Sequence, residues 1–143
     1  MGALTDGVMD AGGEVTGVIP KFMVDNGWCY DRLDDVIITA DMHQRKQMMS
    51  EMADAVIALP GGVGTLEELL ETLTWRQLGL VNVPVIILNT LGYYDALLEM
   101  LHHAVDEGFM KPSHIRLWQV AATSQEAVAL LEDSSNLEIE SKY

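Results

Sequence analysis

The sequence predicts an α/β fold in which a parallel sheet carries helices on its faces. Short β-branched runs alternate with helical patterns from one end of the chain to the other, which is typical of successive β-α-β units. The short runs are continuously apolar instead of alternating between apolar and polar residues, as expected for strands buried on both faces. Together these two observations favour a parallel sheet over an antiparallel one.

Strands and helices are expected in strict alternation along the chain. The strands are predicted at residues 14–19, 35–39, 55–59, 84–89 and 116–121. Apolar residues recur with helical periodicity between them, which predicts helices at residues 3–11, 42–53, 66–78, 94–107 and 125–132.

Cap residues mark the ends of the predicted helices. Asp41 and Thr65 are in position to cap the second and third helices, while Gly79 and Gly108 end the third and fourth. No internal repeat or linker interrupts the pattern. We therefore expect one nucleotide-binding domain over residues 1–132, followed by a polar tail at residues 133–143.

The amino-acid composition argues against some classes of binding partner. The 143 residues include 22 acidic and 8 basic side chains, which gives a net charge of −14 and argues against nucleic acid or an anionic membrane surface as a partner. The longest apolar stretches, such as residues 83–88, are far shorter than the ~20 residues that a membrane helix needs. Cys29 is the single cysteine and cannot form an internal disulfide, and the four histidines show no zinc-type ligand spacing, so we expect a cytoplasmic location without disulfides or structural metal.

The most informative segment is the stretch LPGGVGTLEELLETLTWRQL at residues 59–78, where a glycine-rich turn joins a buried strand to a helix. Gly61, Gly62 and Gly64 let the backbone approach a ligand without interference from a Cβ atom. Amides at the start of the helix then point at the ligand, together with the positive end of the helix dipole. The segment predicts a site for a phosphate or a ribose hydroxyl, although the GxGxxG and P-loop spacings are both missing.

Two carboxylates, Glu67 and Glu68, follow this predicted anion site, and two interpretations of them are open. Carboxylates beside an anion site are electrostatically unfavourable, so one of them is expected to have a chemical role. Alternatively, Thr65 and Glu68 form a capping box, in which the Glu68 side chain accepts a hydrogen bond from the Thr65 amide.

Arg45 and Lys46 are the only adjacent basic residues in this acidic chain. A guanidinium offers a planar fork to phosphate and an ammonium offers a point charge, so the pair could supply positive field to the predicted anion site. The alternative is a solvated helix face on which both side chains meet nearby acids.

Several segments resemble one known family. Residues 60–68, PGGVGTLEE, resemble the PGGxGTxxE motif of the LOG family of cytokinin riboside 5′-monophosphate phosphoribohydrolases. Residues 42–46, MHQRK, resemble the family's upstream MHxRK segment, and residues 12–20, GGEVTGVIP, resemble its third strand. The resemblance covers nearly the whole chain, and members of this family have often been labelled lysine decarboxylases.

The resemblance implies a Rossmann-like sheet, a homodimer, and hydrolysis of AMP or N6-substituted AMP to free base and ribose 5-phosphate. It implies no cofactor. It also implies that Glu68 is the catalytic carboxylate at the ribose and that Arg45 is its catalytic partner. The substrate contacts that it implies are Lys46, Gly61, Gly62, Val63, Gly64, Thr65, Glu67 and Thr74.

Members of the family begin with a strand, a helix and a second strand that leads into a GLMG segment. Residues 1–3 resemble the end of that segment. The resemblance therefore implies that the first ~35–40 residues of the usual fold, with its first two strands, are absent, and such strands lie near the middle of doubly wound sheets.

Two other functions stay open on the residues alone. One is a non-catalytic nucleotide or cofactor carrier on the same fold, and the other is an assembly module whose glycine-rich turn has no ligand. The enzymatic hypothesis requires that Arg45 and Glu68 converge on a single sugar-phosphate pocket.

Overall fold

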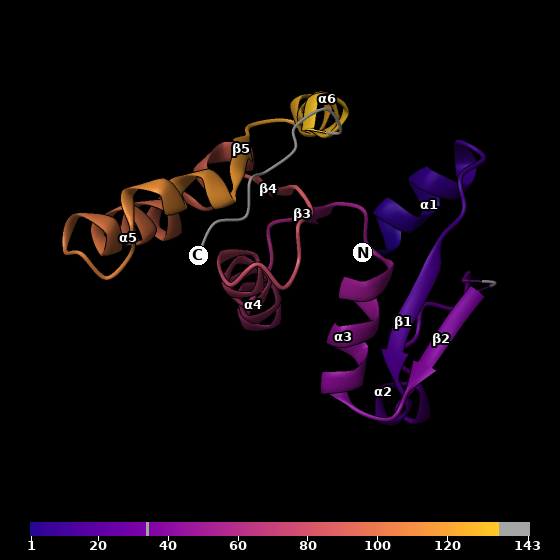
Figure 1. Ribbon diagram of the computed structural model, residues 1–143. Coiled ribbons are helices and arrows are strands. Elements are labelled where there is room, and N and C mark those ends of the chain that lie inside the picture. The colour runs from indigo at the N-terminus through magenta and orange to yellow at the C-terminus, as the bar shows by residue number, and fades with distance from the viewer. Residues whose placement is uncertain (34, 135–143) are drawn as a thin grey trace. The chain divides into compact units, whose positions relative to one another are not determined.

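The computed structural model describes residues 1–33 and 35–134 (Figure 1). These described residues fall into two compact units, those within Met1–Met52 (unit 1) and those within Ala53–Tyr143 (unit 2), and each unit is described by itself. Parallel strands flanked by helices occur in both units, which confirms the predicted class. Within the described residues the strands form two sheets, one of two strands and one of three, where a single sheet was expected. That residues 1–132 make one domain stays a prediction.

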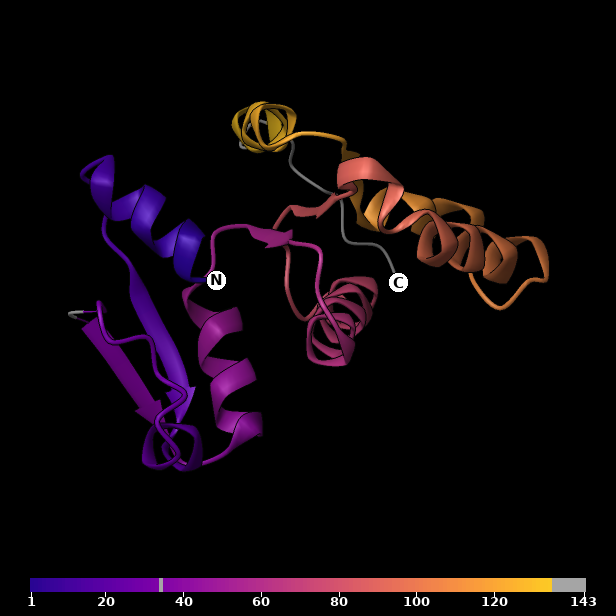
Figure 2. The same ribbon diagram turned by 180° about the vertical axis from the view of Figure 1, so that it is seen from behind.

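Unit 1 contains two parallel strands and three helices. Its elements are α1 (Gly2–Asp10), β1 (Thr16–Pro20), α2 (Lys21–Asp25), β2 (Asp35–Thr39) and α3 (Met42–Met52). β1 and β2 run side by side, with Gly17 opposite Val36 and Ile19 opposite Ile38, and α3 packs on both strands. Both strands end at the side where α2 lies (Figures 1 and 2). This end of the unit therefore gathers the segments that follow β1 and β2.

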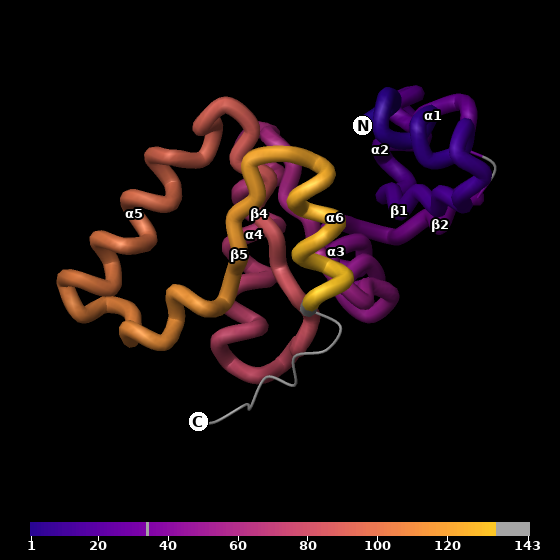
Figure 3. The backbone as a smooth tube through the Cα atoms, turned by 90° about the horizontal axis from the view of Figure 1, so that it is seen from above, coloured from indigo at the N-terminus to yellow at the C-terminus, as the bar shows by residue number. Residues whose placement is uncertain are grey.

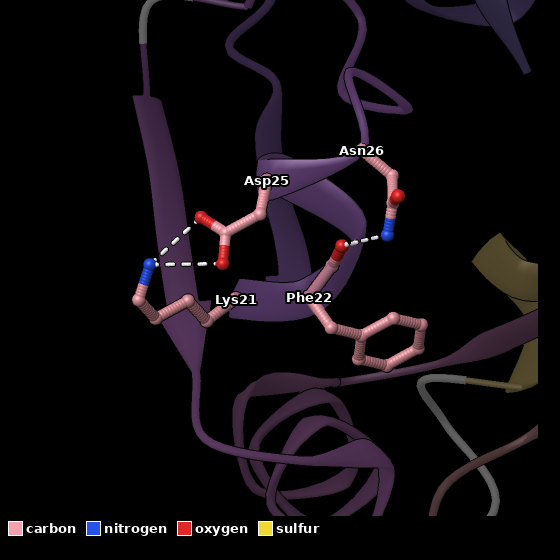
Figure 4. Close-up of polar contacts among 4 residues, drawn as sticks. All are labelled: Lys21, Phe22, Asp25 and Asn26. Carbon is pink, nitrogen blue, oxygen red and sulfur yellow. Dashed lines mark hydrogen bonds and ion pairs between the residues drawn. The ribbon is translucent and has the colours of Figure 1, made fainter.

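The short helix α2 was not predicted from the sequence. Its single turn is closed by an ion pair between Lys21 Nζ and both Asp25 carboxylate oxygens, at 2.7 and 3.0 Å, and by the Asn26 side-chain Nδ2, which donates to the Phe22 carbonyl at 2.6 Å (Figure 4). A five-residue helix is too short to show a periodic apolar pattern, so these local contacts are its only signal.

Unit 2 contains a three-stranded parallel sheet in the order β3-β4-β5. In the register, Ile57 lies opposite Ile86 and Ile87 lies opposite Val120. The elements in chain order are β3 (Val56–Ala58), α4 (Val63–Gln77), β4 (Val85–Leu88), η1 (Thr90–Gly92), α5 (Asp95–Asp106), η2 (Pro112–Leu117), β5 (Gln119–Ala121) and α6 (Ser124–Ser134).

The core of unit 2 is built on both faces of β4. Val85 and Ile87 pack with Leu69 and Leu73 of α4 and with Trp118 on one face. Ile86, between them in the strand, packs on the other face in a cluster of its own, with Ala121 and Ala127. α6, which contributes Ala127, lies beside β4 and β5 (Figure 3). Helices on both faces of the sheet are thus confirmed for this unit.

Burial on both faces is confirmed for β4 alone. The central strand has buried residues at three of its four positions, whereas side chains of β1, β2, β3 and β5 are partly exposed. The predicted strand at residues 116–121 is shorter than expected, because Pro112 begins the 3₁₀ helix η2, which continues to Leu117. Only residues 119–121 remain extended.

Helix ends follow the predicted caps in most places. The Asp41 carboxylate accepts a hydrogen bond from the Gln44 amide at 2.8 Å, which confirms Asp41 as the cap of α3. Gly79 and Gly108 have φ values of 72° and 79°, in the left-handed region that favours glycine after a helix. α6 extends to Ser134, so the first residues of the predicted polar tail are helical, and residues 135–143 lie outside the described part.

Candidate functional site

The glycine-rich turn between β3 and α4 forms an open helix start. α4 begins at Val63 with Gly62 as its N-cap, and the first helical hydrogen bond joins the Leu66 amide to the Gly62 carbonyl at 3.1 Å. The amides of residues 63–65 therefore have no intrahelical acceptor. Together with the helix dipole they form an electropositive helix end, and its binding of a phosphate or ribose hydroxyl stays a prediction.

The predicted cap at Thr65 is wrong. The helix begins three residues earlier than expected, because Gly62 takes an extended conformation and caps it without a side-chain hydrogen bond. Thr65 therefore lies at the third helical position. The capping box with Glu68 is wrong for the same reason, since its cap residue lies inside the helix.

Gly61 is the position in the turn where a side chain cannot fit. A Cβ atom placed there would lie 2.3 Å from Thr65 Oγ1 and 2.9 Å from Thr65 Cβ. At Gly62 and Gly64, by contrast, such a Cβ would meet no heavy atom of the described residues within 4 Å apart from its chain neighbours and the adjoining helix backbone. The threonine of the motif therefore packs directly on the first glycine, and this contact sets the path of the turn into α4.

Glu67 and Glu68 lie in the second turn of α4, beyond the free amides. Glu67 is exposed and Glu68 is half-buried, one position before the core residue Leu69. Thr74 is nine residues past Thr65 on the same helix, which corresponds to ~13 Å along its axis. Its hydroxyl donates to the Leu70 carbonyl at 2.8 Å, so it does not lie at the open end of the helix. Its role as a substrate contact stays a prediction.

Two tyrosines that sequence reasoning missed hold the glycine-rich turn. Tyr93 Oη donates to the Gly61 carbonyl and Tyr94 Oη donates to the Leu59 carbonyl, each at 2.6 Å. Both follow β4, which is paired with β3, so the segments after the two strands leave the same edge of the sheet. The sequence signal that could have found them is their position directly after a predicted strand, because the segments that follow neighbouring parallel strands lie at the same edge of the sheet.

Burial raises the pKa of the Tyr94 hydroxyl above its ordinary value of 10.0, and the neighbouring Tyr93 raises it further, while a backbone hydrogen bond at Gly61 opposes the shift. Tyr94 is 2% exposed. Its hydroxyl therefore stays protonated and remains a donor to Leu59 at every pH below 10.

Arg45 and Lys46 lie in the first turns of α3, in unit 1. Arg45 is half-buried and its Nε donates to the Val18 carbonyl of β1 at 2.9 Å, while Lys46 is 9% exposed. The burial of Lys46 contradicts a fully solvated helix face for this pair, while pairing with nearby acids is neither shown nor contradicted. The guanidinium is instead seated against the backbone of the sheet.

The predicted site residues thus divide between the units. Arg45 and Lys46 belong to unit 1, and Gly61, Glu68 and the other residues of the turn and of α4 belong to unit 2. The structure brings Gly61 and Thr65 into contact. The convergence of Arg45 and Glu68 on one pocket stays a prediction.

The described residues show neither a metal-binding cluster nor a membrane-spanning helix. Over residues 1–33 and 35–134, no group of three or more His, Cys, Asp and Glu side chains is arranged to hold a metal ion. None of the helices in the same residues combines the length and apolarity of a transmembrane segment.

Comparison with known proteins gives one consistent answer. The model of the family described as “Possible lysine decarboxylase” matches residues 1–131. The chain is 46% identical over 132 residues to cytokinin riboside 5′-monophosphate phosphoribohydrolase LOG5 of Arabidopsis thaliana, across 92% of this chain and 58% of the relative. It is 47% identical over 133 residues to the probable cytokinin riboside 5′-monophosphate phosphoribohydrolase LOGL3 of Oryza sativa subsp. japonica, across 93% of this chain and 63% of the relative. The chain therefore spans less than two thirds of the length of these relatives.

Proposed function

The chain belongs to the family described as “Possible lysine decarboxylase”, which includes the LOG proteins, and from this membership we propose that it hydrolyses the N-glycosidic bond of a nucleoside 5′-monophosphate. The proposed substrate is AMP or an N6-substituted AMP, and the products are free base and ribose 5-phosphate. The names of the similar plant proteins describe this kind of hydrolysis and no decarboxylation, which favours hydrolysis over the activity in the family's description.

The observation that carries this proposal is the open start of α4, with a half-buried carboxylate one turn further along the helix. The free amides of residues 63–65 suit a phosphate or ribose oxygen. Since Thr65 does not cap the helix, the capping box no longer accounts for Glu68. A half-buried carboxylate one turn past the free amides fits a function in chemistry at the sugar.

Cleavage of an N-glycosidic bond develops positive charge on the ribose ring. In the proposed reaction the bond between C1′ and the base nitrogen breaks, and the departing base keeps the electron pair and takes up a proton. Glu68 accepts a proton from a water molecule, which forms the new bond to C1′, and its negative charge stabilises the oxocarbenium-like transition state. Glu67 is the proposed neighbouring substrate contact.

Arg45 and Lys46 are proposed to supply the positive charge that the turn itself lacks. Arg45 keeps one nitrogen on the Val18 carbonyl, so its fork is oriented by the sheet before any ligand binds. We propose that the Arg45 guanidinium faces the phosphate or the departing base and that Lys46 holds the phosphoribosyl group with the amides of the turn.

The test is chromatographic detection of adenine after the chain is incubated with AMP, alongside adenosine as a second substrate. We expect adenine from the monophosphate and none from the nucleoside, because the turn binds the phosphorylated sugar. Glu68→Gln keeps the size of the side chain and removes its charge, so release should fall at least ~100-fold. Glu71→Gln, one turn further along α4, is the matched control and should release adenine at the rate of the unmodified chain.

Full activity in the Glu68→Gln variant would exclude the assigned role of this carboxylate. Binding of AMP by the unmodified chain without any release of adenine would instead identify the carrier function. Failure to bind AMP or ribose 5-phosphate would leave the turn without a ligand, as in an assembly module.

Assembly, location and domain organisation complete the proposal. We propose a homodimer in the cytoplasm, with residues 1–132 as one nucleotide-binding domain. Val63 and Leu70 of α4 are apolar and exposed, which supports a subunit contact along this helix, and sedimentation equilibrium measures it. Nucleic acid and membrane remain outside the proposed partners because of the net charge of −14.

A further inference from the structure

Tyr93 and Tyr94, the tyrosine pair, touch the same turn but in different surroundings. Tyr94 is buried, at 2% exposure, and belongs to the core around β4, whereas Tyr93 is 54% exposed. The rings pack edge to face, with centroids 4.9 Å apart and planes at 88°. Tyr94 is therefore anchored by packing, and Tyr93 is held against it with its hydroxyl on the Gly61 carbonyl.

A network after β4 holds the tyrosine pair in place. The Asn89 side chain accepts a hydrogen bond from the Tyr94 amide at 2.6 Å and donates one to the Asp95 carboxylate at 2.7 Å. Between them the backbone is strained, since Leu91 has a φ of 55° in the region that favours glycine. The next residue, Gly92, has a φ of 73°, and a Cβ there would lie 2.5 Å from Asp95. The chain thus accepts an unfavourable conformation where it brings the tyrosines onto the turn.

The contact at Gly61 has a geometric consequence for the next amide. A peptide unit is planar, and no cis peptide occurs in the described residues, so the Gly61 carbonyl and the Gly62 N–H point in opposite directions. When Tyr93 binds the carbonyl, it also directs the Gly62 N–H away from itself. Within the described residues that N–H has no backbone acceptor, and it immediately precedes the free amides of α4.

We propose that Tyr93 is a positioning residue: its hydroxyl sets the Gly61–Gly62 peptide so that the Gly62 amide, with the amides of residues 63–65, binds the anionic group of a phosphorylated ribose. Tyr94 supports the same turn from the core by holding Leu59. This inference rests on the proposed function, because it names the group that orients the donors of that site. It assigns Tyr93 no contact with the substrate.

The test compares Tyr93→Phe with Tyr30→Phe, a matched control. Both variants remove one phenolic hydroxyl and keep the ring, but Tyr30 Oη bonds Asp6, in unit 1. The first readout is the Gly62 amide resonance in ¹⁵N–¹H spectra of the whole chain during a titration with inorganic phosphate. The second is KM and kcat for AMP, and the third is the melting temperature.

We expect Tyr93→Phe to shift the Gly62 resonance before any phosphate is added and to raise the Kd for phosphate and the KM for AMP by roughly three- to tenfold. The kcat should change by less than roughly twofold, because Tyr93 does not act on the reacting atoms. The melting temperature should stay close to that of the unmodified chain, since Tyr93 is half-exposed. Tyr30→Phe should leave the Gly62 resonance and the phosphate affinity unchanged.

An unmoved Gly62 resonance in Tyr93→Phe, or equal phosphate affinity in both variants, would overturn the inference. So would a Gly62 resonance that does not respond to phosphate in the unmodified chain, since the amide would then lie outside the anion site. If phosphate binds as described but AMP yields no adenine, the proposed hydrolysis fails while the role of Tyr93 is supported. The two failures are therefore distinguishable.

Discussion

The two units of this chain bury different kinds of side chain. Among the described residues, every buried apolar side chain except Pro20 lies in unit 2, around β4. In unit 1 the other buried positions are Thr5, Thr39 and Lys46. Unit 2 is thus stabilised mainly by removal of apolar surface from water, whereas unit 1 depends more on hydrogen bonds such as that from Arg45 to Val18.

Because of this difference, the candidate site residues are held in place differently in the two units. In unit 2 the apolar core fixes Tyr94, and through the tyrosine pair it fixes the glycine-rich turn. In unit 1 the candidate residue Lys46 is itself buried, and Arg45 beside it is half-buried against β1. A substitution in the core of unit 2 can therefore affect stability without touching a site residue, while in unit 1 the two effects coincide.

The largest expected effect compares one isoleucine from each unit. Ile87 of β4 is fully buried, so Ile87→Ala should lower the free energy of unfolding by about 2–5 kcal/mol. Ile38 of β2 is 58% exposed, and Ile38→Ala should lower it by less than about 1 kcal/mol. Urea unfolding followed by circular dichroism measures both. Equal losses would contradict the contrast between an apolar core and a polar one.

A smaller effect compares one glycine from each unit. Gly61→Ala places a methyl group 2.9 Å from Thr65 Cβ, beside the helix backbone, and should destabilise the fold by about 1–3 kcal/mol. Gly17→Ala in β1 meets only the tip of the flexible Leu33 side chain at 2.7 Å, which can move, so its expected loss is below about 1 kcal/mol. Thermal unfolding of both variants ranks them, and a larger loss at Gly17 would show that the turn is less constrained than the strand.

The smallest expected effect is a pH dependence that has a different cause in each unit. Burial is the main cause of the raised pKa of Tyr94, whereas the hydrogen bond to Asp6 is the main cause of the raised pKa of Tyr30. Both folded-state pKa values lie above 10.0, so the unfolded chain releases these protons first. Stability contributed by the two groups is therefore complete below pH 10 and is lost as pH rises through the raised pKa values.

Titration of tyrosinate absorbance separates the two causes. Asp6→Asn should lower the pKa of Tyr30, because its principal hydrogen-bond acceptor loses its charge, and should leave the pKa of Tyr94 unchanged. Tyr94→Phe should remove part of the loss of stability above pH 10 and leave Tyr30 as it is. An Asp6→Asn variant in which both tyrosines titrate as before would contradict the assigned cause.

Much of the secondary structure could be predicted because its signals are local. The alternation of strands and helices, the Asp41 cap and the glycines that end helices all depend on residues within a few positions of each other. Two boundaries were predicted wrongly, the start of α4 and the start of the last strand, and both errors also have local causes. Gly62 is as good a start signal as Thr65, so the beginning of α4 was placed three residues late, and Pro112 redirected a segment whose composition favoured a strand.

Some residues of the candidate site could likewise be predicted from local sequence, and others could not. The glycine-rich turn, the carboxylates of α4 and the basic pair were all visible as residue types at fixed spacing. Tyr93 and Tyr94 were not, because they act on carbonyls 32 and 35 residues away in the chain, and only the pairing of β3 with β4 brings them there. The burial of Lys46 was equally hidden, since a lysine in a polar helix is ordinarily exposed.

By itself, then, the amino-acid sequence determined the α/β class, the glycine-rich turn between strand and helix, and the family to which the chain belongs, since these depend on residue type and short-range order. Tertiary structure alone decided which carbonyls are held by the tyrosine pair, where α4 begins and which charged side chains are buried. The physical reason is that hydrogen bonds and packing between distant segments depend on the path of the backbone, and neighbouring residues do not specify that path.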